Sequence, residues 1–185
     1  MQKLLDMEIL GPFDFLPFQQ GGLSLYNDQN AWKPGIYFWV YNLNDSLLIN
    51  YIGITSTSIA QRQSAHLSSF FSGFYDIYDV DSLLIGHLDK AYTPGDGHEK
   101  LCKSQEHLEK QLKLLKFFFA PVSVELSVLK RVETAFIKHV RSSNEFSRIL
   151  DNGSVSRYRR DDEAAIHVSI HTKTEIRGMP SELFV

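Results

Sequence analysis

The stretch that decides the fold is Gly35-Ile36-Tyr37-Phe38-Trp39-Val40-Tyr41, which Tyr51-Ile52-Gly53 follows after a polar interruption at residues 42–46. Both segments are rich in aromatic and β-branched residues, which fit a pleated, buried surface. Two such runs on either side of a short polar segment are typical of a β-hairpin. The sequence therefore predicts antiparallel strands at residues 37–41 and 49–54.

The segment after the second strand has the features of a helix start. Residues 55–58, Thr-Ser-Thr-Ser, offer several hydroxyls that can cap the first free N–H groups of a helix. The helix is predicted to run to about Phe70, and Arg62 and His66, four residues apart, lie on one face of it. An arginine and a histidine are thereby directed to one place beside the hairpin.

The two triplets and the Arg-x-x-x-His helix together resemble the GIY-YIG nuclease family, which takes its name from these triplets. Taken singly, a strand tyrosine is usually a core residue and a helical Arg/His pair is usually a solvated face. The order and spacing carry the resemblance, which covers residues 35 to about 152. It implies an α/β (α+β) fold with a small, mainly antiparallel three-stranded core sheet flanked by helices.

The resemblance also implies a catalytic set for hydrolysis of a phosphodiester bond. Carried over residue by residue, the family positions fall on Tyr37, Tyr51, Arg62, His66 and Glu133. A bracing asparagine completes the set, and it is either Asn152, which is preferred if a short extra helix covers residues 145–150, or Asn144, which lies closer to the usual spacing.

Each of these residue types suits its implied role. A tyrosine has an ordinary pKa of about 10, so Tyr37 could act as a base only if nearby cations favoured its phenolate. The planar guanidinium of Arg62 can donate two parallel hydrogen bonds to a phosphate. Glu133 offers a hard oxygen ligand for one divalent metal, Mg²⁺ with Mn²⁺ as an alternative. Tyr51 would position the water or a phosphate oxygen.

The rest of the chain is predicted to decorate this domain. Residues 1–34 are interpreted as an N-terminal extension, residues 35–152 as the GIY-YIG-like nuclease domain, residues 72–120 as an insertion within it, and residues 153–185 as a C-terminal addition on the same domain. The other elements predicted from apolar periodicity are a short strand at 82–88, a helix at 104–119 ended by Pro121, a strand at 122–128, a helix at 130–141 with Glu133 in its first turn, and a strand at 164–171.

Composition bounds the class of protein. The 185 residues are 43% hydrophobic and 22% charged, which is typical of one folded domain. The lone Cys102 cannot form an internal disulfide, and no apolar run approaches the roughly 20 residues that cross a bilayer. We therefore expect a cytoplasmic protein without membrane contact. Its oligomeric state, a homodimer included, stays open.

The formal net charge of −3 argues against nonspecific attachment to DNA, so binding would need a local basic surface. The candidate residues are Lys130, Arg131, Lys138, Arg157, Arg159 and Arg160. The function predicted is a metal-dependent endonuclease that cleaves DNA, of restriction-like or mobile-element type. The alternative is a catalytically silent nucleic-acid-binding or protein-interaction module on the same scaffold.

Overall fold

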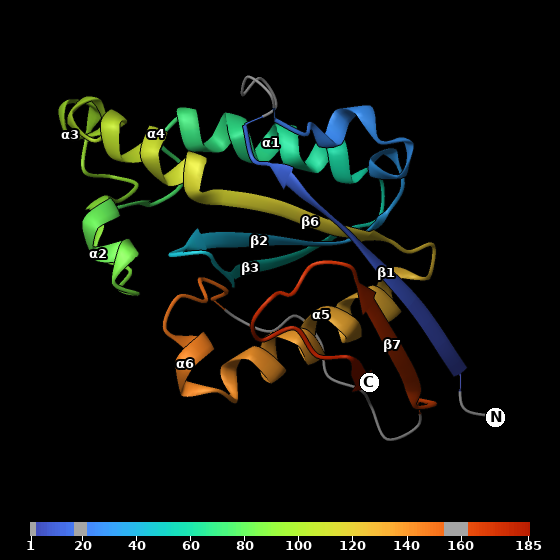
Figure 1. The fold of residues 1–185 in the computed structure, drawn as a ribbon. Coiled ribbons are helices and arrows are strands. Elements are labelled where there is room, and N and C mark those ends of the chain that lie inside the picture. Colours follow the sequence, from blue (N-terminus) through green and yellow to red (C-terminus); the bar gives the residue numbers. More distant parts are fainter. Residues whose placement is uncertain (1–2, 17–21, 154–162) are drawn as a thin grey trace.

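A computed structural model describes residues 3–16, 22–153 and 163–185 of the chain. The fold is mixed α/β and is built on one curled six-stranded sheet, with strand order β3-β2-β6-β1-β7-β8 (Figure 1). The strands of this sheet are β1 (Lys3–Asp14), β2 (Gly35–Leu43), β3 (Ser46–Thr55), β6 (Leu115–Pro121), β7 (Ile166–Thr172) and β8 (Glu182–Phe184). The longer helices are α1 (Ile59–Phe71), α4 (Gln105–Leu114) and α5 (Leu126–Arg141).

The predicted hairpin is confirmed. β2 and β3 are antiparallel, with Tyr37 opposite Gly53, and β6 pairs antiparallel with the other edge of β2. A register shift opposite Trp39 and Val40 leaves Asn50 as an extra residue in β3. The predicted helix after the hairpin is confirmed as α1, and the side chain of Ser58 caps it by accepting from the N–H of Gln61.

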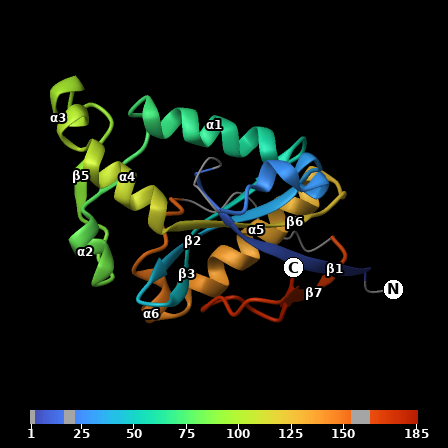
Figure 2. The same ribbon diagram turned by 45° about the horizontal axis from the view of Figure 1, so that its top comes forward.

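Both faces of the central strands are buried, which explains why their sequences are apolar almost throughout. Ile36, Phe38 and Val40 pack with α5 on one face, while Tyr37 and Trp39 pack with α1 and α4 on the other. Figure 1 shows α1 and α4 on one side of the sheet and α5 on the opposite side, and Figure 2 shows α1 and α4 from a second direction. The catalytic candidates on β2 and α1 therefore lie in the layer between the sheet and α1.

The third antiparallel strand is not where the sequence pattern predicted it. The helix expected at 104–119 ends at Leu114, and the Phe-Phe-Phe run belongs to β6, which ends at Pro121. The strand predicted at 122–128 is wrong, because α5 already begins at Leu126. Glu133 consequently lies about two turns into α5 and not in its first turn.

The segment between α1 and β6 forms a small group of helices and short strands at one end of the sheet. It contains β4 (Ile77–Tyr78), α2 (Val80–Leu84), β5 (Lys90–Tyr92), α3 (His98–Lys103) and α4. The strand predicted at 82–88 is wrong: Asp79 caps a helix there through the N–H of Ser82. Because Leu115–Pro121 forms β6, an inner strand of the six-stranded sheet, the last residues of the insertion predicted at 72–120 belong to that sheet.

The terminal segments belong to the sheet itself. β1 pairs antiparallel with β6 and parallel with β7, which is the strand expected at 164–171, and β8 extends the sheet beyond β7. The expectation of a three-stranded core sheet is therefore not confirmed. The remaining described elements are the short 3₁₀ helices Leu25–Asn27 and Gln29–Trp32 and the short helix α6 (Asn144–Ser147). Within the described residues, no helix has the length and apolarity needed to span a membrane.

Candidate active site

Tyr37 is buried in the layer between β2 and α1, and the glycine of the second triplet makes room for it. A Cβ built on Gly53 would lie 2.3 Å from the Tyr37 hydroxyl oxygen, far inside contact distance. Glycine is required in the first triplet for a similar reason, because a Cβ on Gly35 would lie 2.1 Å from the main-chain oxygen of Ala120 in β6. Each triplet thus needs its glycine for close approach of a neighbour.

Three predicted residues meet at the Tyr37 hydroxyl. His66 Nε2 lies 2.8 Å from this oxygen, and Arg62 donates to it from Nε at 3.4 Å. His66 is 2% exposed, whereas Arg62 is an exposed residue of the same helix face. The phenol, the imidazole and the outward-lying guanidinium therefore form one continuous polar group.

Burial sets the protonation of these groups. It raises the pKa of the Tyr37 phenol well above its usual range, and the nearby Tyr51 adds to this, while Arg62 opposes it. Burial also lowers the pKa of His66 to about 3, with a further contribution from the Arg62 charge. At neutral pH Tyr37 is thus a neutral phenol and His66 a neutral imidazole. The phenolate that a Tyr37 base would need is disfavoured.

The two remaining predicted residues, Tyr51 and Glu133, interact with each other electrostatically. The Tyr51 ring is 6.2 Å from that of Tyr37 between centroids. Burial raises the pKa of Tyr51, the Glu133 carboxylate raises it further, and Arg62 opposes the rise. On the side of α1, the His66 ring lies 6.1 Å from the Tyr51 ring between centroids. Tyr51 therefore links Glu133 electrostatically to the group around Tyr37.

Asn152, the preferred one of the two asparagine candidates, lies against the edge of β3. Its side chain accepts from the N–H of Ile52 at 2.9 Å and donates to the Ile52 carbonyl at 2.7 Å, so it replaces a neighbouring strand. A second side chain of β3, that of Asn50, donates to the carbonyl of Ile149 at 2.7 Å. Asn144, the alternative, is an exposed residue at the start of α6.

Among the predicted site residues, Glu133 is the carboxylate that could hold a divalent metal. Glu133 is half-buried on α5, and its charge is close enough to raise the pKa of Tyr51. Within residues 3–16, 22–153 and 163–185, no group of three or more His, Cys, Asp or Glu side chains could enclose a metal ion. A Mg²⁺ ion that keeps most of its waters and takes one protein carboxylate fits this donor set. A closed, all-protein metal cage does not.

Only some of the residues predicted to form a basic surface are among those that the structure describes. Lys138 is exposed on α5 and Lys130 is half-buried there. Arg131 does not fit the role, because its side chain is buried, donates to the carbonyl of Ala164 at 2.9 Å and lies 3.9 Å from the Glu163 carboxylate. Arg157, Arg159 and Arg160 lie outside the described residues.

A residue that the sequence interpretation missed extends the site. Tyr75, in the segment after α1, places its hydroxyl 2.8 Å from Nδ1 of His66. Tyr75, Tyr51 and His66 also border a cavity of about 240 Å³, together with Asp76 and Asp151. No spacing rule in the chain pointed to Tyr75. The available signal was the concentration of aromatic residues at positions 70–78, directly after the helix that carries His66.

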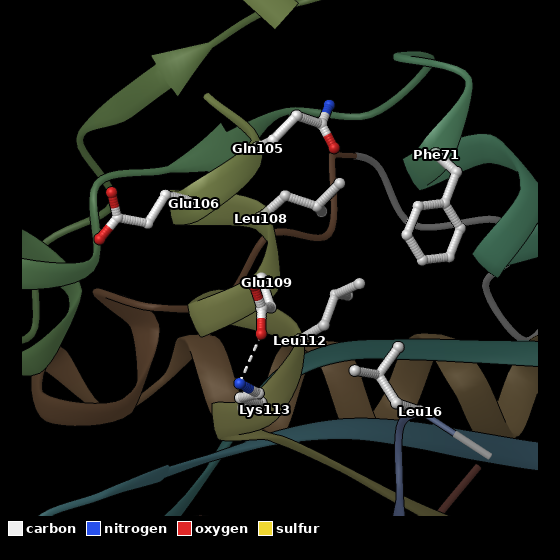
Figure 3. A pocket seen from close by; sticks show the side chains of 8 residues that line it. All are labelled: Leu16, Phe71, Gln105, Glu106, Leu108, Glu109, Leu112 and Lys113. Carbon is white, nitrogen blue, oxygen red and sulfur yellow. Dashed lines mark hydrogen bonds and ion pairs between the residues drawn. The ribbon is translucent and has the colours of Figure 1, made fainter. Parts of the chain in front are cut away.

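A larger groove of about 620 Å³ lies elsewhere, between α4, the end of α1 and Leu16 (Figure 3). Its floor is apolar, formed by Leu16, Phe71, Leu108 and Leu112, and its rim carries an ion pair of 2.6 Å between Glu109 and Lys113. None of the predicted catalytic residues lines it. The larger groove therefore lies apart from the catalytic candidates.

Comparison with known proteins found no match to this chain among family models, curated proteins or solved structures.

Proposed function

We propose that this chain is a divergent endonuclease of the GIY-YIG type, which hydrolyses phosphodiester bonds of DNA with one divalent metal. The observation that carries the proposal is the Tyr37 hydroxyl held between Nε of Arg62 at 3.4 Å and Nε2 of His66 at 2.8 Å. β2, β3 and β6 with α1 and α5 would then correspond to the core of the family fold. β1, β7 and β8 would be additions that widen its sheet.

The arrangement divides the work of hydrolysis among the residues present. The exposed guanidinium of Arg62 would receive the scissile phosphate and offset charge on its oxygens. An attacking water would pass its proton to the Tyr37 oxygen as the Tyr37 proton moves to Nε2 of His66. The tyrosine then stays neutral throughout, which its buried surroundings favour. His66 ends the step as an imidazolium.

Glu133 is the residue that would hold a magnesium ion. A bound ion would supply positive charge to the leaving oxygen. Tyr51, which interacts electrostatically with both Glu133 and Tyr37, would orient the phosphate or the water. Asn152 contributes by holding the Tyr51-Ile52 part of the edge strand in place through two main-chain hydrogen bonds.

The direct test is cleavage of supercoiled plasmid DNA by the purified protein with Mg²⁺. We expect nicked or linear product from the wild type, and a loss of roughly 10²–10³ in rate for Arg62→Ala, because one transition-state contact is removed. Glu133→Gln should be similarly impaired at equal Mg²⁺. Glu106→Gln is the matched control, since this carboxylate is exposed on α4 and pairs with Lys110.

The same experiment separates the alternative of a catalytically silent module, which the acidic net charge favours. A folded wild type that binds DNA in Mg²⁺ without cleaving it would support that alternative. Cleavage that survives unchanged in a well-folded Arg62→Ala variant would refute the catalytic set proposed here.

A further inference from the structure

Both ring nitrogens of His66 are occupied by tyrosine hydroxyls. Nε2 lies 2.8 Å from the Tyr37 oxygen and Nδ1 lies 2.8 Å from the Tyr75 oxygen. A neutral imidazole carries one N–H donor and one lone pair. One tyrosine hydroxyl must therefore donate a hydrogen bond to the ring, and the other must accept one from it.

The surroundings of Tyr37 indicate which tyrosine donates to the His66 ring and which accepts from it. The Tyr37 oxygen already accepts from Nε of Arg62, so the hydroxyl has a proton to donate. Its neighbours are the Tyr51 hydroxyl and Nε2 of His66, and an imidazole nitrogen is much more basic than a phenol oxygen. The positive guanidinium beside Tyr37 also favours a lone pair over an N–H on that side of the ring. Nε2 is thus the acceptor.

We propose that Tyr75 is a positioning residue, which accepts a hydrogen bond from Nδ1–H of His66 and thereby keeps the Nε2 lone pair directed at Tyr37. The inference rests on the proposed function for its purpose, because a base must present its lone pair to the proton that it takes. When the Tyr37 proton reaches Nε2, the imidazolium still has a partner for its Nδ1–H in Tyr75.

The charged and titratable groups around this ring come from four segments. Tyr37 on β2, Tyr51 on β3 and Arg62 on α1 lie on its Nε2 side, and Tyr75 covers Nδ1. His66 and Tyr75 both border the cavity that contains the carboxylates of Asp76 and Asp151, and Asp76 forms an ion pair of 2.7 Å with Lys90. Because Tyr75 follows α1, its hydroxyl brings a residue of the segment between α1 and β6 into contact with the imidazole. The segment between α1 and β6 thus contributes to the site itself.

Histidine ¹⁵N NMR tests the assignment without reference to activity. The signals of His66, one of seven histidines, are identified by their loss in His66→Gln. At neutral pH we expect Nδ1 to be the protonated nitrogen in the wild type, and Tyr75→Phe to shift population toward the Nε2–H form. Tyr92→Phe is the matched control, because it removes a hydroxyl that holds the same segment through the Gly73 carbonyl.

Cleavage kinetics supply the second readout. Tyr75→Phe should lower kcat by about tenfold, a part of the roughly 10²–10⁴ that general base catalysis supplies, with KM unchanged. Tyr92→Phe should leave both parameters as in the wild type. A wild type with Nε2 protonated, or a Tyr75→Phe variant with an unaltered tautomer, would overturn the inference. Absence of cleavage by the wild type would count only against the proposed function, since the NMR result stands apart from it.

Discussion

The buried His66 makes the stability of the fold sensitive to mildly acidic pH. Its pKa falls from an ordinary 6.5 to about 3 in the folded chain, chiefly because burial disfavours the imidazolium. Between these values the unfolded chain binds more protons than the folded chain, so the free energy of unfolding decreases as pH falls. Integrating this difference between pH 8 and pH 5 gives a loss of about 2 kcal/mol from His66 alone.

Urea unfolding at several pH values, compared between the wild type and His66→Gln, isolates that loss. The glutamine can hydrogen-bond but does not titrate, so the wild type should lose about 2 kcal/mol more than the variant on going from pH 8 to pH 5. Carboxylates with a lowered pKa, such as Asp79 and Asp96, lose their contribution mainly below about pH 4 and do not interfere. Parallel curves for the two proteins over this range would refute the reasoning.

Two further substitutions test how the site is held. Gly53→Ala should push the Tyr37 phenol out of place, destabilise the fold by about 1–3 kcal/mol and reduce plasmid cleavage, and a variant with wild-type urea midpoint and activity would contradict this. Asn152→Ala should cost about 1–3 kcal/mol of unfolding free energy, because it leaves main-chain groups of β3 unpaired. Asn144→Ala, at an exposed position, should stay within about 0.5 kcal/mol, and equal effects of the two asparagine changes would argue against the brace.

The hairpin and its helix could be predicted because local signals there agree with the tertiary structure. The apolar runs of β2 and β3, the polar turn and the Ser58 cap each favour the element that forms. The third strand could not be placed in the same way. Leu108, Leu112, Leu115 and Phe119 keep a helical period across the junction of α4 and β6, so the period continues although the backbone has become extended at Leu115.

The number of strands in the sheet could not be predicted from local sequence patterns, for a related reason. β1 lies between β6 and β7, so its partners are residues more than a hundred positions later in the chain. Because of this long-range pairing, β1, which was interpreted as part of an N-terminal extension, is an inner strand of the sheet. The candidate site shows the same division: the resemblance, through order and spacing, implied Tyr37, Tyr51, Arg62 and His66, whereas Tyr75 joins them only through the fold of the segment after α1.

Burial of Tyr37 constrains how any hydrolysis here could proceed. A phenolate in this position would face the desolvation that raises the pKa of Tyr37, so a stepwise mechanism through tyrosinate is unfavourable. A phosphodiester bound at Arg62 would make that phenolate still less favourable, because it adds negative charge nearby. The same added charge favours an imidazolium and offsets the Arg62 charge that lowers the pKa of His66. Substrate binding would therefore raise the basicity of His66 while keeping Tyr37 neutral, which is the combination that a proton transfer through the tyrosine to the histidine requires.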